Sequence, residues 1–384
     1  MTARRSLPVA ALIAVPAALA LSACSATTSS SDAGSGTSGG AIAVAATDTT
    51  CEVARAEAPA GQVEFTVTNS GSKINEFYVY AEGDRIMGEV ENITPGLTRT
   101  FHVELAEPGT YETACKPGMV GDGIRASFTV TGASAAPKTT DENLAAATTE
   151  YQRYVASQAD AFLARTTEFV ALVKAGKVDE AKALYPTARS YWERIEPVAE
   201  SFGDLDPKID GRAEVVDEGM EFTGYHRLER DLWESGLQPD SAAMADRLLA
   251  DVTELVTKAK AVELNPLQLA NGSKALLDEI ATGKITGEEE RYSHTDLWDF
   301  EANFEGSKAA IAALRPFLSS ADPALVATID ERGKALGDLL ETYRDGDGFV
   351  LYTDLTPDDV KKLTTALDGF SEPVATVAGV VAKG

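Results

Sequence analysis

Hydrophobic and polar residues alternate along the chain between residues 41 and 133. Val63, Phe65 and Val67 form one such run, and turn-forming sequences such as Asn-Ser-Gly and Pro-Gly separate it from similar runs. Successive side chains of a strand point to opposite faces, so short alternating runs indicate strands with one buried face. The pattern predicts an all-β domain at residues 41–133, built as an antiparallel sandwich or barrel.

Over residues 141–384 the hydrophobic positions recur instead with the period of an α-helix. Tyr151, Phe162 and Phe169 mark one face of a long first helix, which we expect to end at Gly176. Further helices are predicted over 178–197, 213–235, 241–264, 267–283, 297–317, 323–345 and 357–383. The chain is therefore predicted to be multidomain, with an all-α bundle after the β domain.

The first residues have the features of an export signal. Two arginines precede an uncharged hydrophobic stretch that ends in LSAC at residues 21–24. This ending resembles a bacterial lipobox, so we expect residues 1–23 to be a lipoprotein signal peptide and Cys24 to carry lipid. Residues 24–40, rich in Ser and Gly, would form a flexible tether. The expected location is extracytoplasmic and anchored to the cell membrane; the alternative is an ordinary signal peptide.

The charge balance narrows the range of partners. The chain has 60 acidic and 34 basic residues, a formal net charge of −26 at pH 7. Nucleic-acid binding and attachment to anionic lipid both depend on basic surfaces, so these two classes are disfavoured. A cationic partner such as a metal ion remains compatible with the composition.

Three cysteines leave an odd one in an exported protein. If Cys24 carries lipid, Cys51 and Cys115 remain as a pair. Two interpretations stay open for this pair: a disulfide, which is usual in an oxidising compartment, or two ligands of one metal site.

A His-x-x-Glu motif supplies the first candidate chemistry in the helical domain. On a helix His226 and Glu229 lie on one face, so both can reach a single ligand. The alternative is a structural histidine, with Glu229 paired to Arg227 or Arg230. The inverted zinc motif of metallopeptidases is H-x-x-E-H, and Arg230 occupies its second histidine position, which weakens the case for an enzyme.

Two further segments, 191–210 and 287–300, are densely polar for helical regions. Carboxylates that converge with an imidazole form an oxygen-rich site suited to iron or another hard cation. Helical bundles build metal sites in this way, from Glu and His on facing helices.

Three sequence blocks in these regions resemble the imelysin (M75-type) family. The blocks are SYWERIEP at 190–197, FTGYHRLE at 222–229 and GEEERYSHTDLWDFEANFEGS at 287–307. The β domain is similar to the cupredoxin-like domain that precedes imelysin in some members. The resemblance implies a non-enzymatic, iron-binding protein of EfeUOB-type iron uptake, which delivers iron to an EfeU-type permease and works beside an EfeB-type haem peroxidase.

The resemblance also implies ligands in the helical domain. The family's G-x-H-x-x-E signature falls on Gly224, His226 and Glu229. Partner ligands are expected from the other two blocks. The predicted metal ligands are His226, Glu229, Glu196 and Asp299, with Glu193 and His294 in reserve.

The β domain departs from a blue-copper protein, whose site takes two His, one Cys and a weak Met ligand. His102 is the domain's one histidine, so a type 1 copper centre is disfavoured. A family-like alternative would bind copper or another metal through Cys51, Glu76, Glu112 and Cys115.

Two other functions stay open at this point. One is an enzyme, either an imelysin-type metallopeptidase or a cupredoxin-based Fe(II) oxidase. The other is a structural or adhesive surface lipoprotein. No catalytic residues are predicted.

Overall fold

The computed structural model describes residues 40–135, 141–202 and 205–384. The predicted signal peptide, Cys24 and nearly all of the tether lie outside the described residues. In the part of the chain that is described, no helix is both long and apolar enough to span a membrane. The two predicted fold classes are confirmed: the last strand of the β domain ends at Thr131 and the first helix of the helical domain begins at Glu142.

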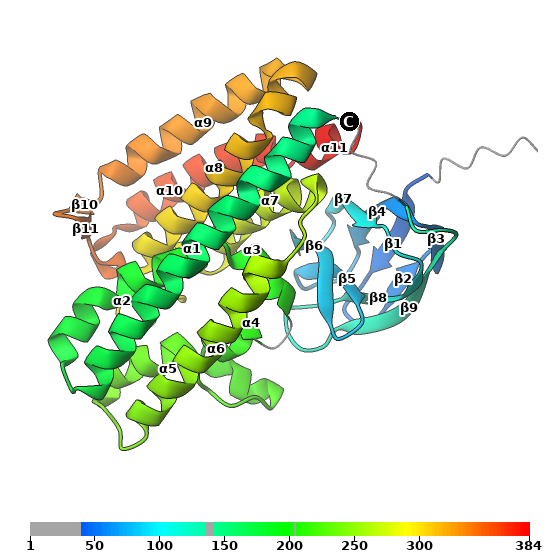
Figure 1. Ribbon diagram of the computed structural model, residues 1–384. Coiled ribbons are helices and arrows are strands. Elements are labelled where there is room, and N and C mark those ends of the chain that lie inside the picture. The colour runs from blue at the N-terminus through cyan, green and yellow to red at the C-terminus, as the bar shows by residue number, and fades with distance from the viewer. Residues whose placement is uncertain (1–39, 136–140, 203–204) are drawn as a thin grey trace, which may run out of the picture. The chain divides into compact units, whose positions relative to one another are not determined.

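The β domain is a sandwich of two sheets (Figure 1). The four-stranded sheet has the order β2-β1-β4-β7 and the five-stranded sheet the order β3-β9-β8-β5-β6. The strands are β1 (Ile42–Ala46), β2 (Cys51–Val53), β3 (Glu57–Pro59), β4 (Gly61–Asn69), β5 (Asn75–Ala81), β6 (Arg85–Ile93), β7 (Thr98–Leu105), β8 (Gly109–Cys115) and β9 (Ile124–Thr131). The core between the sheets is aromatic, and its buried rings are Phe65, Phe77, Phe101 and Phe128.

The expectation of a purely antiparallel domain was wrong for two strand pairs. β1 pairs parallel with β4, and β3 pairs parallel with β9. After the β1–β2 hairpin the chain adds β3 to the other sheet and then returns with β4, which therefore enters the first sheet in the direction of β1. Parallel neighbours need such a crossover connection.

The helical domain contains long helices joined by several short ones. The long helices are α1 (Glu142–Lys174), α2 (Val178–Glu193), α6 (Ser241–Ala261), α7 (Pro266–Thr282), α8 (Asp296–Ala321), α9 (Pro323–Glu341) and α10 (Pro357–Val374). The short ones are α3 (Glu196–Ala199), η1 (Glu200–Phe202), α4 (Leu205–Ile209), η2 (Ala213–Glu218), α5 (Gly224–Arg230), η3 (Asp231–Ser235), η4 (Lys284–Thr286), η5 (Tyr352–Asp354) and α11 (Val377–Val381).

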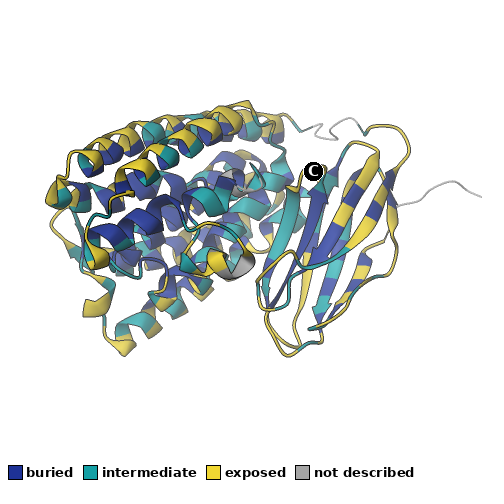
Figure 2. Cartoon of the chain, turned by 90° about the horizontal axis from the view of Figure 1, so that it is seen from below, coloured by how far each residue is buried: buried dark blue, intermediate teal, exposed yellow. Residues whose placement is uncertain are grey.

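Helix α1 agrees with its sequence pattern. The Asp141 carboxylate accepts a hydrogen bond from the Asn143 amide, which caps the first turn, and Gly176 follows the last turn with φ +67°. The predicted face with Tyr151 and Phe162 is buried. Figure 2 shows the same division along the other long helices, with buried residues on the faces turned into the bundle.

Three of the predicted long helices are divided, and one of them, 357–383, consists of α10 and α11. The stretch 178–197 ends as a regular helix at Glu193, and the stretch 213–235 consists of η2, α5 and η3. The stretch 323–345 ends in a small hairpin of β10 (Arg344–Asp345) and β11 (Gly348–Phe349), which the sequence pattern did not predict. Most of the polar residues of the candidate site lie in the divided segments and in the loop before α8.

Candidate metal centre

Gly224 brings α5 directly against the end of α4. It has φ +78°, and a Cβ atom at this position would lie 2.2 Å from the carbonyl oxygen of Ile209. Only glycine tolerates both the conformation and the contact. The Thr223 hydroxyl also donates to the carbonyl oxygen of Lys208 (2.9 Å). His226, two residues after Gly224, is thereby placed beside the residue that follows α4, Asp210.

One side of the His226 imidazole is held by Glu229. Nδ1 of His226 lies 3.1 Å from Oε2 of Glu229, within hydrogen-bond distance. The other oxygen of Glu229, Oε1, accepts hydrogen bonds from the backbone amides of Tyr292 (2.9 Å) and Ser293 (2.7 Å). Both oxygens of Glu229 are thus engaged, and the ring is oriented with Nε2 on its other side.

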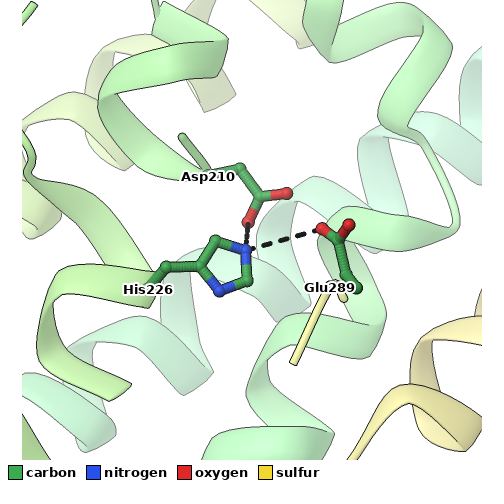
Figure 3. A group of neighbouring side chains, drawn as sticks. All are labelled: Asp210, His226 and Glu289. Carbon is green, nitrogen blue, oxygen red and sulfur yellow. Dashed lines mark ion pairs between the residues drawn. The ribbon is translucent and has the colours of Figure 1, made fainter. Parts of the chain in front are cut away.

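The other side of the ring faces two carboxylates (Figure 3). Nε2 of His226 lies 3.6 Å from Oδ1 of Asp210 and 3.5 Å from Oε1 of Glu289, and it has no hydrogen-bond partner among the described residues. His226 is 1% exposed, and both acids are buried. The three ligand atoms lie within 4.8 Å of one another, close enough to bind one ion. A second group with the same property joins His226, Glu229 and Glu290.

Buried acids outnumber buried cations around this histidine. Seven buried carboxyl groups lie within 4.0 Å of His226, Arg189 or Lys284: Glu193, Glu196, Asp210, Glu229, Glu289, Glu290 and Asp299. Arg189 and Lys284 are themselves fully buried and supply two positive charges. An excess of buried negative charge is costly unless protons or further cations neutralise it.

The pKa values reflect this excess. Burial and the charge of Arg189 lower the pKa of His226, but the hydrogen bond to Glu229 and the nearby carboxylate of Glu289 outweigh them and raise the pKa to about 9. Burial, with the charge of Glu229, raises the pKa of Glu290 to about 8. Burial also raises the pKa of Asp299 well above its usual value, and neither of its oxygens has a hydrogen-bond partner among the described residues. Protons therefore compensate part of the charge when no metal is bound.

The predicted ligands Glu196 and Asp299 line the same buried cluster. Glu196 lies 3.5 Å from Nζ of Lys284, and its other oxygen accepts a hydrogen bond from Asn303 (3.1 Å). Asp299 lies 3.8 Å from Nε of Arg189. Both contact the buried cations and belong to neither group of potential metal ligands. That His226, Glu229, Glu196 and Asp299 bind one ion together stays a prediction.

The two reserve residues lie in different surroundings. Glu193 is fully buried and contacts Arg189 and Lys284. His294 is half-buried in the loop before α8, with φ +60°, and is in neither group. Sequence reasoning did not single out Asp210, Glu289 and Glu290 as ligands. Their only signal was their place in the two densely polar segments.

In the β domain the four predicted ligands do not converge. Cys51 and Cys115 form a disulfide, with their Cα atoms 5.6 Å apart, so in this state neither offers a thiolate. Cys115 pairs with Phe77 and faces the core, while the neighbouring Glu76 points to the opposite face of the sheet. Glu112 lies opposite Tyr80, four residues along the strand from Glu76. The single site of two cysteines and two glutamates is therefore wrong, and the disulfide interpretation holds.

Comparisons with known proteins agree with the two-domain fold. The family model for imelysin matches residues 147–377, and the model for a cupredoxin-like domain matches residues 11–130. The chain is 35% identical over 346 residues to the iron uptake system component EfeO of Escherichia coli K12, which covers 88% of this chain and 91% of the relative. The same values relate it to EfeO of Escherichia coli O157:H7 and of Shigella flexneri. The chain therefore belongs to the imelysin family and also contains a cupredoxin-like domain.

Proposed function

We propose that this protein binds iron outside the cytoplasmic membrane and delivers it to a membrane permease. The relatives named EfeO are components of an iron uptake system, which supports a role in iron uptake. The observation that carries the proposal is the buried Nε2 atom of His226, without a hydrogen-bond partner among the described residues, between Asp210 and Glu289. An imidazole and two carboxylates are ligands that iron accepts.

The surroundings of His226 fit a metal ligand. A metal-binding histidine usually donates its second ring N–H to a carboxylate, which fixes the orientation of the ring. Glu229 meets this requirement at Nδ1, and the two amides on its other oxygen hold it in place. A multivalent cation at Nε2 would also neutralise the excess charge of the buried acids. This arrangement departs from the ligand set predicted from the sequence: Glu229 orients the histidine, while His226, Asp210 and Glu289 bind the ion.

We propose a binding protein and not a peptidase. His226, Glu229 and Glu290 are at most 1% exposed, so an ion can reach them after a small opening but a polypeptide segment would require a large one. Arg230 takes the second histidine position of the inverted zinc motif. In the β domain the Cys51–Cys115 disulfide leaves no thiolate for a copper centre of the blue-copper type, so we do not propose an Fe(II) oxidase there.

Titration with Fe²⁺ under anaerobic conditions tests the centre. His226→Ala should weaken binding at least 100-fold, and Glu229→Ala by about 10- to 100-fold through loss of ring orientation. The double variant should lose less than the sum of both effects, because the two residues act on one ion. Glu288→Ala is the matched control, because Glu288 adjoins Glu289 but is exposed, and it should bind like the wild type. Unchanged affinity in both single variants would place the site elsewhere.

The anchor and the partners belong to the same proposal. Lipid on Cys24 would hold the domains near an EfeU-type iron permease and an EfeB-type haem peroxidase. Cys24→Ala should remove the acyl mass and move the protein from the membrane fraction to the soluble fraction. A wild-type protein that is recovered soluble and without acyl mass would contradict the anchor and leave iron binding untouched.

A further inference from the structure

A buried lysine lies next to the candidate metal centre. Lys284 is the first residue of η4 and is 1% exposed. Four carboxylates surround its ammonium group: Nζ lies 3.3 Å from Glu193, 3.5 Å from Glu196, 3.4 Å from Glu279 and 3.7 Å from Glu289. Arg189 also contacts Glu193 and Glu289, but four carboxylates still outnumber these two positive charges, and such an oxygen-rich environment is typical of a metal ion.

The ammonium group and the position beside His226 share one carboxylate oxygen. Oε1 of Glu289 lies 3.5 Å from Nε2 of His226 and 3.7 Å from Nζ of Lys284. Glu289 therefore stands between two adjacent places for positive charge. Proteins that bind two metal ions next to each other place them about 3.5–4 Å apart, and helical bundles hold such pairs with carboxylates from several helices.

Two further buried residues near Lys284 have side-chain oxygens without a hydrogen-bond partner among the described residues. Asn303 is fully buried, and its Nδ2 donates to the carboxylates of Glu193 (3.0 Å) and Glu196 (3.1 Å), while its Oδ1 has no hydrogen-bond partner there. Asp299, 1% exposed, has two such oxygens, and its charge interacts with those of Glu193 and Lys284. Buried oxygens without donors are costly for a purely structural ion-pair network. A metal ion can bind more oxygen atoms than an ammonium group can. These free oxygens therefore indicate an environment suited to a metal ion.

We propose that Lys284 is a built-in cation that fills a second metal position beside His226, so that the centre binds one iron ion instead of two. This inference rests on the proposed function, because it takes the position beside His226 as the place of the first ion. The lysine is part of the chain and its charge cannot diffuse away, so a second ion would have to displace it from four carboxylates. Lys284 therefore determines how many ions the centre binds.

Counting bound metal tests the proposal. Purified protein is equilibrated with Fe²⁺ under anaerobic conditions, dialysed, and analysed for iron per chain. Lys284→Met should bind one more ion than the wild type, because it removes the charge and keeps the side-chain length. Lys284→Arg keeps the charge and should bind as many ions as the wild type. Lys334→Met is the surface control, with Lys334 exposed and paired to Asp338, and its count should not change.

The variants separate failure of this inference from failure of the proposed function. If His226→Ala loses an ion but Lys284→Met gains none, the role of Lys284 is wrong and the iron site stands. If Lys284→Met gains an ion while His226→Ala loses none, the second position exists and the first is misplaced. Should Lys284→Met unfold without metal, the variant Lys284→Met/Glu279→Gln, with one carboxylate fewer, replaces it. An unchanged count in that variant also overturns the proposal.

Discussion

Replacing Gly224 by alanine tests whether the close contact between α4 and α5 builds the metal centre. The residue has φ +78°, and the new Cβ atom would lie 2.2 Å from the carbonyl oxygen of Ile209. Asp210 follows Ile209 directly, and His226 follows Gly224 by two residues. Any movement that relieves the contact therefore separates two proposed ligands of one ion.

The size of the effect follows from two contributions. A left-handed backbone conformation costs an alanine about 1–2 kcal/mol. The contact adds the cost of forcing extra atoms into a packed region, about 1–3 kcal/mol. A Cβ atom at 2.2 Å must move roughly 1 Å to reach an ordinary contact, whereas binding sites tolerate displacements of about 0.5 Å. We therefore expect Gly224→Ala to lose about 2–5 kcal/mol of stability and to bind Fe²⁺ on the order of 10- to 100-fold more weakly.

Gly176→Ala is the matched control. Gly176 also has positive φ, +67°, but a Cβ atom there would meet nothing within 4 Å. This variant should lose only the conformational cost, about 1–2 kcal/mol, and should keep its affinity for iron. Denaturant unfolding followed by circular dichroism gives the stabilities, and anaerobic Fe²⁺ titration gives the affinities. Equal losses of stability in both variants, with wild-type affinity in Gly224→Ala, would refute the role assigned to the contact.

Two further predictions concern pH. Burial and Arg189 lower the pKa of His226, but the hydrogen bond to Glu229 and the nearby carboxylate of Glu289 raise it to about 9, so iron must displace a proton. The affinity for iron should therefore rise about tenfold per pH unit between pH 6 and 8, and a flat profile would contradict this. Burial raises the pKa of Glu76 to about 7, so the folded state favours the protonated carboxyl group. The stability that this protonated group contributes is lost as the pH rises from 4.5 through 7. Glu76→Gln should therefore stabilise the protein by up to about 3 kcal/mol at pH 8 and much less at pH 5, and equal urea midpoints at pH 8 would rule this out.

The sequence predicted those parts of the structure that depend on local pattern. Helical periodicity located α1 and its buried face, and the His-x-x-Glu spacing placed His226 and Glu229 on one side of α5. The sequence pattern did not identify Asp210 and Glu289, which lie 16 and 63 residues from His226 along the chain, in irregular segments. Their convergence depends on Gly224 and on the turns between α7 and α8, and side-chain periodicity carries no information about such long-range contacts.

The β domain shows the same limit in a different way. Alternation along β5 implies that Glu76 and Phe77 point to opposite faces of the sheet. Which of them shares a face with Cys115 depends on the register between β5 and β8, and the sequence does not specify that register. Cys115 lies opposite Phe77. The same register that allows the disulfide therefore separates Glu76 from both cysteines.

The charge balance of the buried cluster fits the proposed role, in which iron is bound and later released. Seven buried acids face two permanent cations, Arg189 and Lys284, and a histidine. Without metal, the raised pKa values of His226 and Glu290 mean that bound protons compensate part of this charge. Iron that binds at the proposed centre would replace protons that are already present, and this exchange lowers the net free energy gained from binding. The proposed delivery of iron to a permease requires this moderation, whereas a centre that retains its metal permanently does not.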